Sequence, residues 1–153
     1  MIREELVEKI IQLIPEAQIS DNVKITEVIV PKDKLHTLAK NLKENEDTRF
    51  DYLYCVTGVD WSDKFSVVYH LTSTKFNHSV VIKAYISDRE NPEIDSLSDI
   101  WRTAEYHERE IFDLFGIRFN NHPDLRRLFL DDDWKGYPLR KDFVDDINMI
   151  EFR

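Results

Sequence analysis

A group of ionisable side chains that could carry chemistry lies at residues 105–110, with the sequence Glu-Tyr-His-Glu-Arg-Glu. On a helix, His107 and Glu110 would share one face because they are three residues apart, and such a pair could help to bind a metal or transfer a proton. Glu105 and Arg109 have the i,i+4 spacing of a helical ion pair. Because a metal site needs more ligands than this segment supplies, we favour a structural ion-pair network.

The other residues that could bind a metal or act as nucleophiles are dispersed. His70, His78, His107 and His122 lie on separate predicted elements without a His-x-x-x-His pair, so zinc binding would depend on the tertiary fold. Cys55 is the only cysteine of the chain, which excludes an intrachain disulfide and a self-contained iron–sulfur cluster. Because Cys55 lies within an apolar predicted strand, we expect it to pack in the core as a small hydrophobic residue.

The overall charge and the glycines argue against two classes of function. The formal net charge of −9 disfavours nucleic acid as a partner, because phosphate binding needs clustered Lys and Arg. The three glycines, Gly58, Gly116 and Gly136, are too far apart to form a phosphate-binding loop, so we expect no nucleotide site. With 153 residues, 42% of them hydrophobic, the chain has the size and composition of one domain.

The sequence also indicates where the chain resides. No apolar run approaches the roughly 20 residues that a membrane-spanning helix needs. The acidic start, residues 1–5, lacks the apolar region of a signal peptide. We therefore expect the chain to reside in the cytoplasm.

Two helices and a strand are predicted in the first part of the chain. Apolar side chains recur at helical spacing in residues 2–14, and Pro15 ends this helix. Residues 23–30 are β-branched and partly alternating, which predicts a strand. Pro31 then opens a second amphipathic helix, with four apolar side chains between residues 35 and 42.

Three further strands and a longer helix follow. Residues 52–59 are apolar on both faces, which predicts a central strand. Residues 65–72 and 79–86 alternate between apolar and polar and predict an antiparallel hairpin. Thr103 is the predicted N-cap of a helix that ends before Gly116. Together these elements predict a two-layer α+β fold, with a mixed or antiparallel sheet of four or five strands in an order left open, and helices packed on one face.

The last part of the chain lacks this periodicity. Residues 117–153 contain three consecutive aspartates and two prolines, yet they retain many apolar and aromatic side chains. So long a stretch without regular structure is uncommon in an isolated domain, and its aromatic content argues against disorder. We therefore predict that residues 1–116 form the α+β core and that residues 117–153 form an extended C-terminal docking tail of the same domain.

This region carries two basic pairs and two large aromatic side chains: Arg126, Arg127, Arg140, Lys141, Trp134 and Tyr137. Guanidinium groups suit carboxylates on a partner or within the tail itself, and Trp, Tyr and Arg are enriched at interface hot spots. A solvated surface is the alternative. We hypothesise that the core of a protein–protein interface comprises Arg126, Arg127, Trp134 and Arg140.

Several segments with fixed spacing resemble a known family. Residues 108–117, Glu-Arg-Glu-Ile-Phe-Asp-Leu-Phe-Gly-Ile, and residues 122–128, His-Pro-Asp-Leu-Arg-Arg-Leu, are similar to the signature of the 30 kDa (C-type) subunit of respiratory NADH:quinone oxidoreductase, respiratory complex I. The resemblance continues through residues 134–143, Trp-Lys-Gly-Tyr-Pro-Leu-Arg-Lys-Asp-Phe, and includes Thr-Gly-Val-Asp at 57–60. The match over about residues 101–143 is long and specific.

The resemblance implies a non-catalytic subunit in the hydrophilic arm of a proton-translocating oxidoreductase, peripheral on the cytoplasmic side of the membrane. It implies packing against the D-type (49 kDa) subunit, proximity to the B-type subunit, and no cofactor in this chain, since flavin and iron–sulfur clusters belong to partner subunits. One alternative is that the chain is the equivalent subunit of a membrane-bound nickel–iron hydrogenase or of a ferredoxin-dependent complex. A second alternative is a stand-alone metal or acid–base enzyme that uses His107, Glu108 and His122.

No catalytic, cofactor-binding or metal-binding residue is predicted. An interface or structural role is predicted for residues drawn from the three motifs: Glu108, Arg109, Glu110, His122, Asp124, Arg126, Arg127, Trp134, Tyr137, Arg140 and Lys141. Among them, Glu108, Arg109 and Glu110 are expected to form a network that joins the last helix to the tail.

Overall fold

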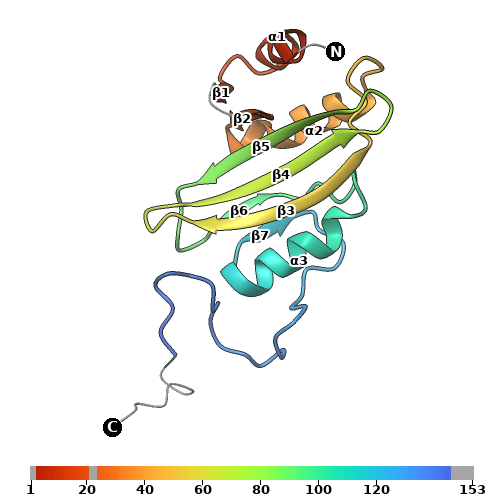
Figure 1. Cartoon of the computed structure of the whole chain (residues 1–153). Helices are drawn as coiled ribbons and strands as arrows, with labels where there is room; N and C mark the ends of the chain where they lie inside the picture. Colours follow the sequence, from red (N-terminus) through yellow and green to blue (C-terminus); the bar gives the residue numbers. More distant parts are fainter. Residues whose placement is uncertain (1–2, 21–23, 146–153) are drawn as a thin grey trace.

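The computed structural model describes residues 3–20 and 24–145, and its framework is a five-stranded mixed sheet (Figure 1). The strand order is β1-β2-β5-β4-β3, with β2 and β5 parallel and all other neighbours antiparallel. The strands are β1 (Gln18–Ser20), β2 (Thr26–Val30), β3 (Tyr52–Asp60), β4 (Phe65–Ser73) and β5 (His78–Ile86). The predicted α+β class, the mixed sheet and the β4–β5 hairpin are confirmed.

Alternation along the strands gives the sheet one buried face and one open face. On β4, Phe65, Val67, Tyr69 and Leu71 are all 0% exposed, whereas the side chains between them include the half-buried His70. Successive side chains of a strand point to opposite faces, so the fully buried set defines the side of the core. The alternation that predicted this strand therefore also determines its orientation.

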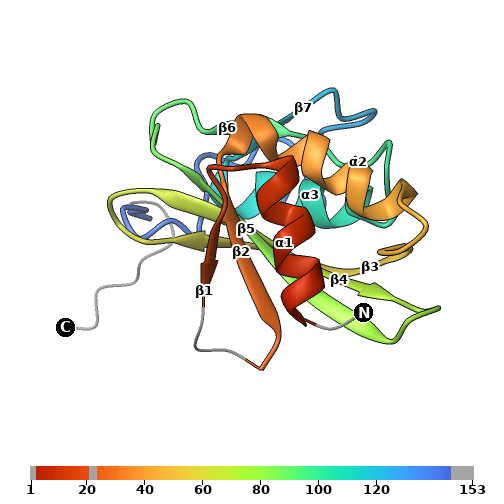
Figure 2. The same cartoon turned by 90° about the horizontal axis from the view of Figure 1, so that it is seen from above.

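Three α-helices cover the buried face, as the views in Figures 1 and 2 show. Their bounds are α1 (Arg3–Leu13), α2 (Leu35–Glu44) and α3 (Ala104–Phe115), and a 3₁₀ turn, η1 (Lys32–Lys34), precedes α2. The buried side chains of α1 and α2 recur at helical spacing and join the strands in one hydrophobic core. The prediction of helices on a single face of the sheet is confirmed.

Helix α3 packs closely on the edge strand β3 because a glycine faces it. A Cβ atom added at Gly58 would lie 3.0 Å from the Phe115 ring and 3.1 Å from Ile111. At its C-terminal end α3 stops at Gly116, whose φ of 73° lies in the left-handed region and whose N–H donates to the Phe112 oxygen at 2.9 Å. The predicted C-terminal glycine of this helix is confirmed.

The prediction that residues 52–59 form a central strand is wrong, because β3 lies at the edge of the sheet. Its two faces have different neighbours. Leu53 and Val56 enter the core, whereas Tyr52 and Tyr54 stack with 6.3 Å between ring centroids and remain 50% and 40% exposed. Aromatic residues suit a half-covered sheet surface, so apolar character on both faces did not mean burial on both faces.

Two smaller expectations are also corrected. Cys55 is half-buried instead of lying in the core, because the β3–β4 register shifts between residues 53 and 55 and pairs Cys55 with His70 of the open face. Thr103 directly precedes α3, but its hydroxyl donates to the backbone oxygen of Leu53 at 3.1 Å and does not cap the helix.

A small second sheet lies next to α3. It pairs β6 (Glu93–Asp95) with β7 (Arg118–Asn120) in parallel, and strands of three residues are too short for a periodic sequence signal. Ile117 and Phe119 belong to the hydrophobic core, so the residues that follow α3 directly are part of the body of the domain. After β7, residues 121–145 contain no helix or strand, and we call them the anchored segment.

Candidate functional site

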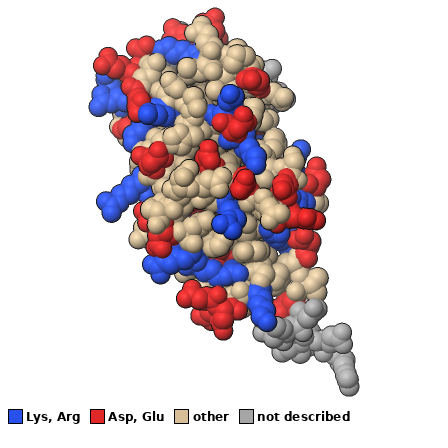
Figure 3. Space-filling model, turned by 180° about the vertical axis from the view of Figure 1, so that it is seen from behind, with Lys and Arg blue, Asp and Glu red and all other residues tan. Residues whose placement is uncertain are grey.

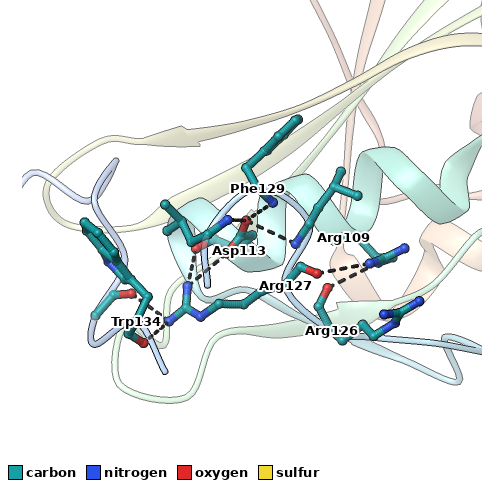
Figure 4. A network of polar contacts seen from close by, with 9 residues as sticks. Arg109, Asp113, Arg126, Arg127, Phe129 and Trp134 are labelled. Carbon is teal, nitrogen blue, oxygen red and sulfur yellow. Dashed lines mark hydrogen bonds and ion pairs between the residues drawn. The ribbon is translucent and has the colours of Figure 1, made fainter. Parts of the chain in front are cut away.

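The anchored segment is attached to α3 through one buried carboxylate, that of Asp113 (Figure 4). Asp113 Oδ2 accepts hydrogen bonds from three consecutive backbone N–H groups, those of Leu128 at 3.2 Å, Phe129 at 2.7 Å and Leu130 at 3.0 Å. Burial alone would raise the pKa of Asp113, but these N–H groups and the Arg127 guanidinium outweigh burial and hold the pKa below its usual value. The ionised carboxylate therefore fixes the conformation of this turn.

Arg127 extends the same junction along the segment. Its Nη1 lies 3.0 Å from Asp113 Oδ1 and donates to the Asp113 backbone oxygen at 2.8 Å. Its Nη2 donates to the backbone oxygens of Trp134 at 3.0 Å and Gly136 at 2.8 Å, and the guanidinium lies 5.0 Å from the Tyr137 ring centroid. A planar group with five donors can make all these contacts, whereas a lysine ammonium could not.

Arg109 makes a third connection between α3 and the segment. Its Nε donates to the backbone oxygen of Arg126 at 3.2 Å and its Nη2 to that of Arg127 at 3.0 Å, as Figure 4 shows. Its guanidinium also lies 5.7 Å from the Tyr106 ring centroid. Among the described residues no ion pair joins Arg109 to Glu105, so the predicted i,i+4 pair is wrong. Backbone carbonyl groups take the place of the acidic partner.

Glu108 is enclosed on the inner side of α3. Its side chain is 0% exposed, and it accepts hydrogen bonds from the Ser96 hydroxyl at 2.6 Å and the Leu97 N–H at 2.8 Å. His122 Nε2 lies 3.8 Å from Glu108 Oε2. Burial raises the pKa of Glu108 to about 7, and the two hydrogen bonds oppose the rise only in part. This carboxyl group therefore titrates near neutral pH inside the folded domain.

His122 fixes the start of the anchored segment against α3. Its Nδ1 accepts the N–H of Asp124 at 3.0 Å, which assigns the proton of the neutral ring to Nε2, and Nε2 donates to the Glu105 backbone oxygen at 2.9 Å. The His122 side chain has no exposed surface, so a substrate could not reach it. The geometry thus gives no support to a metal or acid–base site formed by His107, Glu108 and His122.

A second carboxylate, that of Asp60 at the end of β3, holds the far end of the anchored segment. Arg89 donates to both oxygens of Asp60, at 2.6 and 3.1 Å, and the backbone N–H groups of Lys141 and Ser62 donate at 2.9 and 2.8 Å. The Arg89 hydrogen bonds are the main reason why the pKa of Asp60 lies well below its usual value, although burial opposes them. Arg89 also lies 3.4 Å from Asp142.

Arg140 links this second junction to the end of α3. Its Nε donates to the backbone oxygen of Phe115 at 2.6 Å and its Nη1 to that of Arg89 at 3.3 Å. Its guanidinium lies 5.1 Å from the ring centroids of both Phe65 and Tyr137. Arg140 therefore faces the body of the domain, where hydrogen bonds and the negative ring faces stabilise its charge.

The Tyr137 ring sits directly against the glycine that ends α3. A Cβ atom at Gly116 would lie 2.6 Å from two atoms of this ring. The ring also contacts Phe112 at 6.3 Å between centroids, and the Leu139 N–H donates to the Leu114 oxygen at 3.0 Å. Residue 116 must therefore be glycine both for its backbone conformation and for this close approach.

The four residues of the hypothesised interface core face in different directions. Arg127 and Arg140 turn inward and bind groups of the same chain. Trp134 is half-buried, and its Nε1 is enclosed without a hydrogen-bond partner. The Arg126 side chain is 67% exposed, and among the residues that the structure describes its ion pair is with Asp124, at 2.9 Å. Their role in contacts with another protein remains a prediction.

The last two predicted residues lie at the surface. Lys141 is exposed and is held through its backbone. Glu110 is half-buried and lines a shallow groove of about 160 Å³ between β3, α3 and the exposed Leu139. Of the three acidic and basic residues expected to join α3 to the tail, Arg109 contacts the segment directly and Glu108 lies beside His122, whereas Glu110 faces this groove.

The sequence reasoning missed the two carboxylates that hold the segment. Asp113 lies between Phe112 and Leu114 within a helix, and Asp60 ends an apolar strand. A carboxylate among apolar residues needs compensating donors when it is buried. An aspartate flanked by apolar residues is therefore the sequence signal that could have identified Asp113 and Asp60. The basic pairs of the tail would then have been candidate hydrogen-bond donors.

Within the described ranges, no group of three or more His, Cys, Asp or Glu side chains is placed to hold a metal ion. In the same part of the chain, no helix is both long enough and apolar enough to cross a membrane. The polar contacts at α3 position backbone groups of the anchored segment, so their effect is conformational.

Comparison with known proteins supplies the family. The family described as "Respiratory-chain NADH dehydrogenase, 30 Kd subunit" matches residues 28–147. The chain belongs to this family. The matched range begins in β2 and includes both anchoring carboxylates and the whole anchored segment, so the junctions at α3 lie within the family region.

Relatives of known sequence agree with this membership. The C-type subunit of NADH-quinone oxidoreductase from Moorella thermoacetica is 37% identical over 142 residues, which cover 92% of this chain and 94% of the relative. The C/D-type polypeptide of the same enzyme from Phocaeicola vulgatus is 48% identical over 122 residues, or 79% of this chain and 23% of the relative. The C-type subunit from Chloroherpeton thalassium is 44% identical over 113 residues, or 72% and 47%. The chain thus spans less than half the length of the last two relatives.

A solved structure shares the fold. A chain of the membrane-bound sulfane sulfur reductase, an archaeal respiratory membrane complex, superposes with a TM-score of 0.78 and 29% sequence identity. The match covers 94% of this chain and 86% of the other. The 30 Kd subunit fold is therefore similar to that of a component of a different respiratory complex.

Proposed function

We propose that the chain is a non-catalytic subunit in the hydrophilic arm of a proton-translocating NADH:quinone oxidoreductase. It braces the D-type (49 kDa) and B-type subunits, while flavin and iron–sulfur clusters in other subunits carry electrons from NADH to quinone. The observation that carries this proposal is the attachment of the anchored segment to α3 by a buried carboxylate, in a member of the 30 Kd subunit family.

The two junctions explain why the chain suits a bracing role. Asp113 holds residues 128–130 and Asp60 holds the backbone at Lys141, so the segment is fixed at two points before any partner binds. A surface that is ordered in advance loses little conformational entropy on association. The polar side chains of the site bind backbone groups of the same chain, which supports positioning more than catalysis.

We further propose that the chain is peripheral, on the cytoplasmic side of the membrane, and that the complex holds it there. Charges of both signs are interspersed on the face shown in Figure 3. Anionic lipid and nucleic acid attract clusters of Lys and Arg, whereas the formal net charge of this chain is −9. These features support contacts with protein partners alone.

A second candidate rests on the structural neighbour in the sulfane sulfur reductase complex. The chain would then be the equivalent subunit of a membrane-bound complex with another electron donor, such as a nickel–iron hydrogenase or a ferredoxin-dependent enzyme. The large subunit that co-purifies discriminates between the two candidates, because a hydrogenase-type partner would carry a set of nickel-ligating cysteines.

The proposed function is tested by affinity purification of the full chain, tagged in its own cells and extracted in mild detergent, followed by mass spectrometry. We expect D-type and B-type subunits together with the NADH-oxidising, flavin-bearing subunit. Purification of the chain alone, with a stoichiometric metal or flavin and with turnover of a substrate, would contradict the proposal.

A further inference from the structure

The four most exposed large hydrophobic side chains of the described residues lie on α3 or the anchored segment. They are Val144, Phe129, Tyr106 and Leu139, with exposed fractions of 69%, 66%, 61% and 53%. Single exposed apolar side chains are common on protein surfaces, so exposure alone decides little. Phe129 and Tyr106 differ from an ordinary exposed residue because the chain holds them in place.

Phe129 belongs to the turn that Asp113 fixes. Its N–H makes the shortest of the three bonds to the Asp113 carboxylate, and the N–H groups on either side bind the same oxygen (Figure 4). Tyr106 contacts the guanidinium of Arg109, which in turn holds the carbonyls of residues 126 and 127. Both residues therefore belong to the junction between α3 and the anchored segment.

The rigidity has an energetic implication. Burying a carboxylate costs several kcal/mol before its hydrogen bonds compensate, and here the buried Asp113 orders a turn whose Phe129 side chain remains in water. A local arrangement that exposes a large apolar group without a gain for the isolated domain is typical of a functional surface. Aromatic anchors fixed in advance are also the side chains that dominate interface energies.

Three acidic residues lie close in sequence to the turn that carries Phe129. Asp131, Asp132 and Asp133 follow Phe129 after Leu130 and are all exposed, and the exposed Arg126 of the same turn is paired with Asp124. An apolar centre with a charged rim is the usual anatomy of a protein interface. Because the exposed charges that follow Phe129 are acidic, the complementary surface needs an apolar pocket with Lys or Arg at the edge that faces them.

We propose that Tyr106 and Phe129 form the centre of a docking surface for the D-type subunit, into whose apolar, basic-rimmed pocket they insert. This inference rests on the proposed function and specifies the surface through which the chain braces its partner. It also shifts the expected interface from the inward-facing Arg127 and Arg140 to aromatic side chains.

The choice of the D-type subunit follows from the relatives and from charge. In Phocaeicola vulgatus and Bacteroides thetaiotaomicron, the region similar to this chain is part of one polypeptide, of combined C/D type by its name, and forms 23% and 21% of it. A single polypeptide keeps its parts at a fixed ratio and a high local concentration, which suits parts that remain in contact. A second copy of this chain is disfavoured, since a symmetric contact would bring two acidic rims together.

The test measures the affinity of the full chain and its variants for the separately purified D-type subunit of the same organism by titration calorimetry. Phe129→Ser should raise Kd at least about 30-fold, and Tyr106→Ser about tenfold. Tyr52→Ser removes a comparably exposed aromatic side chain from β3 and should change Kd less than about twofold. Replacing the three aspartates at 131–133 with Asn should slow association about tenfold at low salt and less at high salt.

Each outcome decides the inference. All four variants change exposed side chains, so an unchanged Tm establishes that the fold is intact. Phe129→Ser binding within about twofold of the unmodified chain would overturn the docking surface and leave the proposed function standing. A loss of affinity in Tyr52→Ser as large as that in Phe129→Ser would overturn it too. No binding of the unmodified chain to the D-type subunit would overturn both, and self-association abolished by Phe129→Ser would identify a second copy as the occupant.

Discussion

The Asp113 carboxylate and the Arg127 guanidinium approach to 3.0 Å, and the Asp113 side chain is fully buried while that of Arg127 is 12% exposed. The same carboxylate binds the three N–H groups of residues 128–130. One side chain of α3 thus orders a segment that has no secondary structure of its own. The stability of the domain and the order of the segment should therefore depend on this pair.

Asp113→Asn keeps the shape of the side chain but removes its charge and replaces one acceptor with an NH₂ group. The Arg127 guanidinium then lacks its counter-charge, and a donor faces backbone N–H groups. We expect the free energy of unfolding to fall by about 3 kcal/mol, measured by urea denaturation. Asp124→Asn, which removes the exposed pair with Arg126, is the control and should leave stability unchanged. Equal losses in the two variants would contradict this account of the junction.

Gly116→Ala should destabilise the domain through two effects. A non-glycine residue at a φ of 73° costs roughly 1–2 kcal/mol, and the new Cβ would lie 2.6 Å from the Tyr137 ring. We expect a total loss of about 3 kcal/mol. Tyr137→Ala supplies a double-mutant cycle, because removing the ring relieves the clash and leaves only the backbone cost. If the stability losses of Gly116→Ala and Tyr137→Ala simply add in the double variant, the Tyr137 ring moves away from the new Cβ at no cost. That result would contradict the expected coupling between the two residues.

Glu108 should make stability depend on pH. Its pKa rises from an ordinary 4.5 to about 7 on folding because of burial, so its favourable contribution is full below pH 4.5 and is lost as pH rises through 7. Glu108→Gln mimics the protonated form and should not lose this contribution. We therefore expect the stability of the variant relative to the unmodified chain to rise by about 2.5 kcal/mol between pH 5 and pH 8.

The measurement compares urea denaturation of the two chains at several pH values, and the difference between them is the relevant quantity. Other ionisable groups act on Glu108 or lie beside it, namely Asp99, Glu105 and His122. Because these groups are present in both chains, their direct titration largely cancels in the difference. A difference that stays constant from pH 5 to pH 8 would mean that Glu108 is not neutralised by burial.

Much of the fold followed from periodicity in the sequence. The alternation in β4 and β5 and the helical spacing in α2 are signals over eight or more residues, and burial on one face enforces them. Short or exposed elements were not predicted correctly. The strands β6 and β7 have only three residues each. The edge position of β3 was missed because Tyr52 and Tyr54 are apolar side chains that face an open surface. Periodicity reports which side is buried, and it does not report which strand has a neighbour.

The sequence located the region of the candidate site but did not predict which way its side chains face. The motifs and the aromatic content of the tail identified the region, and the basic pairs were recognised as unusual. Whether a guanidinium faces a partner or the chain itself depends on contacts between distant residues, such as Arg140 with Arg89 and Phe65. The type of an amino acid does not tell whether its side chain faces the solvent or its own chain. The exposure of Phe129 and the burial of Asp113 were therefore seen only in the structure.

Asp60→Asn should release the far end of the anchored segment while its start stays attached. The substitution weakens the hold of Asp60 on the Lys141 N–H and removes its charge beside Arg89, but it leaves the Asp113 junction intact. Trypsin cleaves after Lys and Arg, and its rate at a folded site reports the local opening equilibrium. We expect cleavage after residues 140 and 141 to accelerate about tenfold, corresponding to the loss of roughly 1.4 kcal/mol of local stability.

The position of the cuts makes this prediction specific. Cleavage after Arg126 and Arg127 should keep its original rate, because the turn that follows is still bound by Asp113. Asp142→Asn is the matched control, since Asp142 is 61% exposed and only reaches Arg89 at 3.4 Å, and it should change neither rate. Equal acceleration at both ends in Asp60→Asn would mean that the segment detaches as one unit, and the two carboxylates would then not be independent anchors.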